Sequence, residues 1–325
     1  MKELGKLKDV RTTYLQKIPG VKHQWLLSLM PTAVEMMNLD EFDVVLSSCH
    51  SVSKGVITKP ETLHISYCHT PMRYAWEEWD FETRLQKFPR LLHPMIRKQI
   101  KKIRRWDFAA AQRVDQYIAN SSHIGKQIKK HYERDSVVIY PPVHTQKFKP
   151  VSKPTEDYYF SAGRLIPYKK FDLLVETFNK LEKPLKIAGT GPELERLKKM
   201  AGPTVEVLGY VDEKELIELY ANCRAFLFPQ IEDAGIVPLE AMACGRPVIA
   251  LSRGGSLDTM IDGKTGVLFD SQTVGSLSKA IERFEGMKFD PKFIRKHAEQ
   301  FDVEHFKERV KNFVAEEWKI FERKK

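Results

Sequence analysis

Two basic residues in the segment FSAGRLIPYKKFDLLVETF have the type and spacing to bind phosphate. Arg164 and Lys169 lie on the turn between an expected strand and the helix after it, and Lys170 is placed to substitute for its neighbour. Fixed cations at the carboxyl end of a strand, beside the positive end of a helix dipole, favour a diphosphate. A solvated basic turn is the alternative explanation.

A second turn, in KIAGTGPELERL, places Gly189 and Gly191 directly after another expected strand. Glycines at such a turn let a ligand approach the backbone closely. Every parallel sheet needs tight turns of this kind. The sequence therefore favours a structural role for both glycines over direct contact with a ligand.

Two glutamates eight positions apart give the strongest signal, in FPQIEDAGIVPLEAMACGRPVIALSRGG. Glu232 ends an expected strand, and Glu240 lies on the helix that follows a turn of small residues. This spacing lets the first carboxylate face a ligand at the strand tip while the second reaches another part of it. Backbone N–H groups between them are available to hold an anion. Taken alone, the pair is more often two surface glutamates at a helix start.

Short apolar runs that alternate with helical patterns are expected to position these residues. The alternation indicates βαβ units and hence a parallel sheet with helices on both faces. A similar but thinner pattern occupies the first half of the chain. The expected strands are 44–47, 63–68, 116–119, 137–140, 158–162, 185–188, 205–208, 225–228, 248–250 and 267–269.

Four prolines within residues 141–154 suit a short linker between two domains. We expect an N-terminal domain over 1–145, a C-terminal domain over 146–300 and an amphipathic helix over 301–325, with packing back on the N-terminal domain as one option. The first 150 residues hold only four of the 17 glycines, and the first clear strand begins near Asp43. The N-terminal domain is therefore expected to be incomplete.

Composition excludes several classes of protein. With 42% hydrophobic and 30% charged residues, the 325-residue chain is an ordinary globular protein, neither disordered nor collagenous. Its four cysteines lie far apart, which argues against a zinc ribbon or a disulfide framework. No apolar run approaches the roughly 20 residues that span a bilayer, and no secretion signal begins the chain. A cytoplasmic location is expected.

The net charge of +10 is concentrated in one patch. Residues 84–134 contain fourteen Lys and Arg against three acidic residues, which leaves the rest of the chain near −1. In 92–103 an apolar helical stripe is surrounded by cations, as suits a helix at an anionic membrane surface, with about 1 kcal/mol per cation. A solvated basic face fits equally well. No nucleic-acid-binding module accompanies the patch, so nucleic acid is not an expected partner.

The motifs together resemble the family 4 retaining glycosyltransferases. GRLIPYKKFDLLVETF, GTGPELERL, LGYVDEKELIELYANCRAFLFP and EDAGIVPLEAMACGRPVIA appear in the family's order over about 110 residues. In the first half, SSCHSVSKGV, SYCHTPMRYAWE and ANSSHI are similar to a subgroup that contains bacterial O-antigen and other polysaccharide mannosyltransferases. The resemblance implies the glycosyltransferase-B fold, two Rossmann-like domains facing across a cleft. Relative to that family the start of the chain looks shortened.

The resemblance also implies roles for single residues. Arg164 and Lys169 would bind the donor diphosphate and stabilise the leaving group, and Glu232 would contact the donor sugar. Glu240 would bind the ribose, and His69 would face the donor sugar from the N-terminal domain. The further implied substrate-binding residues are Gly235, Ile236 and Val237 through their amides, with Gly189, Gly191, Val211 and Lys170.

The implied activity is transfer of a hexose, mannose by resemblance, from a nucleotide-diphosphate sugar such as GDP-mannose to a lipid-linked or polysaccharide acceptor. No cofactor or metal is expected, because cations on the protein can stabilise the leaving diphosphate. The implied location is the inner face of the cell membrane, in lipopolysaccharide or polysaccharide biosynthesis. The alternatives are a nucleotide-sugar-binding protein with impaired catalysis and a nucleotide-sugar epimerase.

Overall fold

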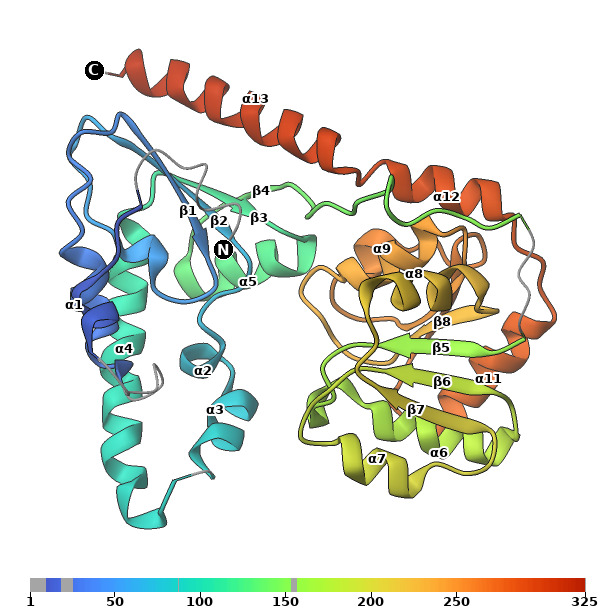
Figure 1. The fold of residues 1–325 in the computed structure, drawn as a ribbon. Helices are drawn as coiled ribbons and strands as arrows, with labels where there is room; N and C mark the ends of the chain where they lie inside the picture. The colour runs from blue at the N-terminus through green and yellow to red at the C-terminus, as the bar shows by residue number, and fades with distance from the viewer. Residues whose placement is uncertain (1–9, 19–25, 87, 153–156, 325) are drawn as a thin grey trace. The chain divides into compact units, whose positions relative to one another are not determined.

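The computed structural model describes residues 10–18, 26–86, 88–152 and 157–324 of an α/β protein (Figure 1). The chain divides into two compact units, 1–138 with 312–325 (unit 1) and 139–311 (unit 2). Residues 139–145, expected to end the first domain, therefore belong to unit 2. Val143 and Phe148 are buried in the unit 2 core, so the proline-rich segment is packed rather than a free linker.

Unit 2 is built on a six-stranded sheet in the order β10-β9-β8-β5-β6-β7, parallel throughout. The order reverses between β5 and β8, which are neighbours in the sheet but far apart in the chain. This is the arrangement of a Rossmann-type sheet. The strands are β5 (Tyr159–Ala162), β6 (Leu185–Ala188), β7 (Val205–Gly209), β8 (Ala225–Phe228), β9 (Val248–Leu251) and β10 (Gly266–Phe269).

Helices cover both faces of this sheet (Figure 1). Successive strand residues point to opposite faces, so Phe160 and Phe226 enter one apolar core while Tyr159 and Leu227 enter the other. Burial on both sides explains why these strands read as continuous apolar runs. One face carries α6 (Phe171–Leu181), α7 (Leu194–Met200) and α11 (Val274–Glu285); the other carries α8 (Glu213–Asn222), α9 (Ile236–Ala243) and α12 (Pro291–Glu299). The remaining elements of unit 2 are η6 (Pro167–Lys169), α10 (Ser256–Thr259) and the first part of α13 (Val303–Glu322), whose residues from Asn312 on belong to unit 1.

Unit 1 contains a four-stranded parallel sheet in the order β1-β2-β3-β4. β1 lies at one edge, and no strand among the described residues pairs with its outer side. Leu46, on β1, is 48% exposed. The strands are β1 (Val44–Cys49), β2 (Leu63–Cys68), β3 (Gln116–Ala119) and β4 (Val137–Val138). The helices are η2 (Tyr14–Lys17), α1 (Met30–Glu35), η4 (Ser53–Gly55), α2 (Arg73–Trp76), α3 (Glu78–Leu85), η5 (Arg90–Leu92), α4 (His93–Gln112) and α5 (Ser122–Tyr132).

The basic segment of the sequence forms the 20-residue helix α4. Ile100 and Ile103 of its expected apolar stripe are buried. Two of its cations bind within unit 1, because Arg97 pairs with Glu82 of α3 and Arg104 donates a hydrogen bond to a backbone carbonyl of α2. Among the described residues, every helix is either too short or too polar to span a lipid bilayer.

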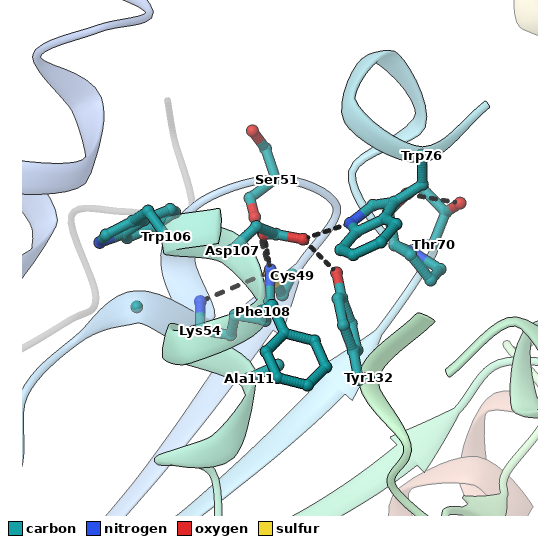
Figure 2. A network of polar contacts seen from close by, with 12 residues as sticks. Cys49, Ser51, Lys54, Thr70, Trp76, Trp106, Asp107, Phe108, Ala111 and Tyr132 are labelled. Atoms are coloured by element: carbon teal, nitrogen blue, oxygen red, sulfur yellow. Dashed lines mark hydrogen bonds and ion pairs between the residues drawn. The ribbon is translucent and has the colours of Figure 1, made fainter. Parts of the chain in front are cut away.

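A buried acid organises the interior of unit 1 (Figure 2). Asp107 of α4 is completely buried and forms an ion pair with Lys54 of η4, which is 1% exposed. The other carboxylate oxygen accepts hydrogen bonds from the indole of Trp76 (2.7 Å) and the hydroxyl of Tyr132 (2.8 Å). Lys54 donates further to the carbonyl of Ser51 at 3.1 Å. The network thus joins η4, α2, α4 and α5.

Candidate functional site

The reversal of strand order in unit 2 brings two distant loops together. The loop after β5 leads to α6 on one face of the sheet, and the loop after β8 leads to α9 on the other. Ligands of open parallel sheets bind at such a switch point, outside the carboxyl ends of the strands. The first loop carries Arg164 and ends in η6 at Lys169, and the second carries Glu232. The three charged residues expected at the reacting centre therefore come from adjacent loops.

Lys169 and Glu232 form an ion pair at the switch point. Lys169 Nζ lies 3.2 Å from Glu232 Oε1, and the two side chains are only 14% and 20% exposed. Arg164 is exposed, and within the described part of the chain no carboxylate lies at ion-pair distance from it. The two cations therefore differ: Lys169 is paired with an acid, and Arg164 is available to bind an anionic ligand.

Two glycines after β9 hold the loop that carries Glu232. The Gly255 N–H donates to the Glu232 carbonyl at 2.8 Å. A β-carbon on Gly254, whose φ is +67°, would lie 2.4 Å from the same carbonyl oxygen, and one on Gly255 would lie 2.6 Å from the Cα of Ala234. Only glycine permits this close approach. The two adjacent glycines in the sequence are the signal that could have indicated this contact.

A cavity of about 580 Å³ opens at the carboxyl ends of β5, β6 and β7. Arg164, Gly189, Gly191 and Val211 of the expected site residues line it. Tyr210 also lines it, with a side chain that is 79% exposed. The complete lining is Ala162, Gly163, Arg164, Ala188, Gly189, Thr190, Gly191, Tyr210, Val211 and Leu216.

Both glycines of the β6 turn are required by packing between loops. A β-carbon on Gly189 would lie 1.8 Å from the carbonyl oxygen of Gly163, and one on Gly191 would lie 2.2 Å from that of Leu165. Their φ angles of +144° and +157° also disfavour other residues. The structural role favoured by the sequence is therefore present, and the same close packing shapes the wall of the cavity.

Glu240 lies in α9 and contacts Tyr220 of α8. The Tyr220 hydroxyl donates to Glu240 Oε2 at 3.0 Å. Burial raises the pKa of Glu240 to about 7, although this hydrogen bond and nearby Lys147 act in the opposite direction. Lys147 itself pairs with Glu213. Neither Glu232 nor Glu240 is among the residues that line the cavity.

The turn before α9 ends in a glycine with a left-handed backbone conformation. Gly235 is buried, has a φ of +67° and precedes the helix, and Ile236 and Val237 are its first two residues. N–H groups in the first turn have no acceptor within the helix. At the start of α6, Lys170 has a φ of +56° and is partly exposed.

His69 belongs to unit 1 and follows β2 directly. Its Nε2 lies 2.8 Å from the Ser48 hydroxyl, and its carbonyl accepts a hydrogen bond from the Asn120 side chain at 2.9 Å. Burial and neighbouring His50 lower its pKa. Among the described residues, no group of three or more His, Cys, Asp or Glu side chains is placed to hold a metal ion.

Comparison with known proteins identifies curated relatives of part of the chain. It is 35% identical over 137 residues to the GDP-mannose-dependent alpha-(1-6)-phosphatidylinositol monomannoside mannosyltransferase of Mycolicibacterium smegmatis, over 37% of this chain and 36% of that protein. It is 25% identical over 252 residues to the alpha-1,3/1,6-mannosyltransferase ALG2 of Dictyostelium discoideum, over 62% of this chain and 57% of that protein. The chain thus spans roughly a third to three fifths of these relatives.

Solved structures show the same fold at low sequence identity. Sucrose-phosphate synthase from Thermosynechococcus elongatus superposes with a TM-score of 0.70 at 20% identity, over 92% of this chain and 81% of that one. Anabaena HepE, solved in complex with UDP and glucose, superposes with a TM-score of 0.62 at 16% identity, over 90% and 82%. The fold is therefore glycosyltransferase-B, with two Rossmann-like domains.

The family profile covers most of unit 2. The profile described as "Glycosyl transferases group 1" matches residues 143–306, which is half of the chain. This range contains the Arg164 loop, the Lys169–Glu232 ion pair, the cavity and Glu240. The chain therefore belongs to the group 1 glycosyltransferases.

Proposed function

We propose that the chain is a retaining glycosyltransferase that moves mannose from a nucleotide-diphosphate sugar to a lipid-linked or polysaccharide acceptor. The observation that carries the proposal is the cation of Arg164, which pairs with no acid among the described residues, at a cavity beside the Lys169–Glu232 ion pair. Mannose is favoured because two relatives are named as mannosyltransferases, one of them dependent on GDP-mannose. The bacterial O-antigen and polysaccharide subgroup remains the proposed context, on the motifs of the first half.

In the proposed reaction, positively charged side chains lie beside the phosphate on which negative charge develops. As the bond from sugar to phosphate breaks, negative charge develops on the leaving diphosphate, and Arg164 and Lys169 would stabilise it by several kcal/mol, of the order of the roughly 3–4 kcal/mol of one oxyanion donor. These cations would take the place of a divalent metal ion. In a front-face attack the leaving phosphate would accept the acceptor's proton, while Glu232 would orient the sugar.

Further residues are proposed to bind the donor. The α9 N–H groups at Gly235, Ile236 and Val237 would hold its sugar and phosphate, and Glu240 would bind the ribose. The cavity walls at Gly189, Gly191 and Val211, together with Lys170, would complete the donor site. His69 of unit 1 is proposed to contact the donor sugar through its imidazole.

The test is a turnover assay with GDP-, UDP- and ADP-sugars, each with and without a lipid-linked oligosaccharide acceptor. We expect release of the nucleoside diphosphate with one donor only when the acceptor is present, and a product whose anomeric configuration by NMR matches that of the donor. Donor binding without turnover would instead indicate a sugar-nucleotide binder. Conversion of one hexose into its epimer would indicate an epimerase.

A matched pair of variants connects the assay to the site. Lys169→Ala should weaken nucleoside-diphosphate binding, measured by calorimetry. Lys183→Ala is the control, because Lys183 also pairs with a glutamate of unit 2, Glu285 at 2.8 Å, but near the amino end of β6. Equal binding by the two variants would remove Lys169 from the site.

We also propose that α4 attaches the protein to the anionic inner face of the cell membrane. Four of its cations, Lys98, Lys101, Lys102 and Arg105, are exposed, and near them Leu91 and Met95 are 91% and 57% exposed. Cations beside exposed apolar side chains favour an anionic lipid surface. Sedimentation with phosphatidylglycerol vesicles tests this attachment, and replacing the four cations by Gln should abolish binding to the vesicles. Equal binding to neutral phosphatidylcholine vesicles would contradict the electrostatic part.

A further inference from the structure

One of the two cations that we propose to bind phosphate already forms an ion pair in the ligand-free protein. Lys169 is paired with Glu232, and both side chains are largely buried. Glu232 Oε1 accepts no hydrogen bond from any described residue, so the Lys169 ammonium is its neutralising partner. A partly buried carboxylate without that partner would be strongly disfavoured. An anionic ligand that binds Lys169 must therefore weaken the ion pair that neutralises Glu232.

The ammonium of Lys169 lies close both to Glu232 and to the cavity wall at Gly163. It would lie 3.4 Å from a β-carbon on Gly163, and Gly163 lines the cavity. The backbone at Glu232 is held in place, because its carbonyl accepts a hydrogen bond from the Gly255 N–H and is closely packed by Gly254. A diphosphate that reaches Lys169 thus competes with the Glu232 carboxylate for the same cation. It is also repelled by that carboxylate.

We propose that Glu232 weakens the binding of the sugar-free nucleoside diphosphate by competing for Lys169, and so promotes release of this product after transfer. The inference rests on the proposed function of the site. A donor still carrying its hexose offers hydroxyl groups that can donate to the Glu232 carboxylate, which compensates for the loss of Lys169. The nucleoside diphosphate has no such groups at that position. Competition by Glu232 therefore acts on the product more than on the donor.

The experiment measures GDP, UDP and ADP binding by calorimetry to the wild-type chain and to Glu232→Gln. We expect the variant to bind the preferred nucleoside diphosphate about tenfold more tightly, which is about 1.4 kcal/mol. Glu285→Gln is the matched control: Glu285 pairs with Lys183 and accepts from Tyr159, the first residue of β5, so the same charge is removed near the opposite end of the strand. This control should bind as the wild type does.

A double-mutant cycle tests whether Glu232 acts through Lys169. In a Lys169→Ala background the gain from Glu232→Gln should fall by more than half. An undiminished gain would overturn the competition for Lys169. If wild type binds a nucleoside diphosphate and Lys169→Ala binds it less, but Glu232→Gln binds no more tightly, this inference is refuted while the proposed function stands. If no nucleoside diphosphate binds the wild type, both fail.

Discussion

Replacing Asp107 by asparagine should destabilise unit 1 strongly. The substitution preserves shape but removes the charge that neutralises buried Lys54, and it turns an amide N–H₂ toward donors. Breaking one partner of a buried ion pair costs about 3–5 kcal/mol. The Asn oxygen can still accept from Trp76 and Tyr132, but the amide N–H₂ then faces the Lys54 ammonium, so the three donors around Asp107 can no longer all be satisfied. We therefore expect a loss near the upper end of that range.

The five tryptophans make unit 1 separately observable. The sequence has no tryptophan in 139–311, the range of unit 2, so tryptophan fluorescence during urea unfolding reports on unit 1. The control is Asp135→Asn, since Asp135 pairs with Lys129 at 2.8 Å with side chains 91% and 61% exposed. An exposed pair of this kind contributes about 0–1 kcal/mol. If Asp107→Asn lowers the free energy of unfolding no more than this control, the buried network does not stabilise the unit.

Three other outcomes follow from the site. Because burial raises the pKa of Glu240 to about 7, above its ordinary value of 4.5, its contribution to stability is present at low pH and is lost as pH rises through 7. The free energy of unfolding of Glu240→Gln should therefore rise, relative to that of the wild type, by up to about 3 kcal/mol between about pH 5 and pH 8, measured by urea unfolding with circular dichroism. A difference between the two proteins that does not change with pH would refute the raised pKa of Glu240. Gly189→Ala should lower the melting temperature much more than Gly209→Ala, because both have positive φ but a β-carbon at Gly209 meets nothing within 4 Å; similar losses would mean that strain alone matters. Chelation with EDTA should leave sugar transfer unchanged if Arg164 and Lys169 neutralise the diphosphate, whereas a loss that Mg²⁺ restores would contradict that role.

The strands of both sheets were predictable from local sequence. Each expected strand forms, with small differences at its ends; β4, for example, covers Val137–Val138 instead of four residues. Prediction succeeds here because a strand buried on both faces needs a continuous apolar run, and the loops around it carry glycine, proline or polar residues. The pairing of the β5 and β8 loops also follows from strand order once the parallel sheet is recognised.

Features that depend on distant partners were not predictable. Asp107 reads as one of three acids in a basic segment, and nothing near it in the sequence indicates Lys54, 53 positions earlier, or Tyr132. The same limit applies to Glu240: its spacing from Glu232 was visible, but its contact with Tyr220 was not. The proline-rich segment looked like a linker because its buried residues, Val143 and Phe148, have their partners in unit 2 far along the chain.

The edge of the unit 1 sheet affects how the protein behaves at high concentration. β1 has the sequence VVLSSC, without a charged residue or proline, and Leu46 on it is half exposed. Charges and prolines are the usual protection of an edge strand against pairing with another chain. Samples should therefore self-associate as they are concentrated, and a lysine in place of Leu46 would be a direct way to keep them monodisperse.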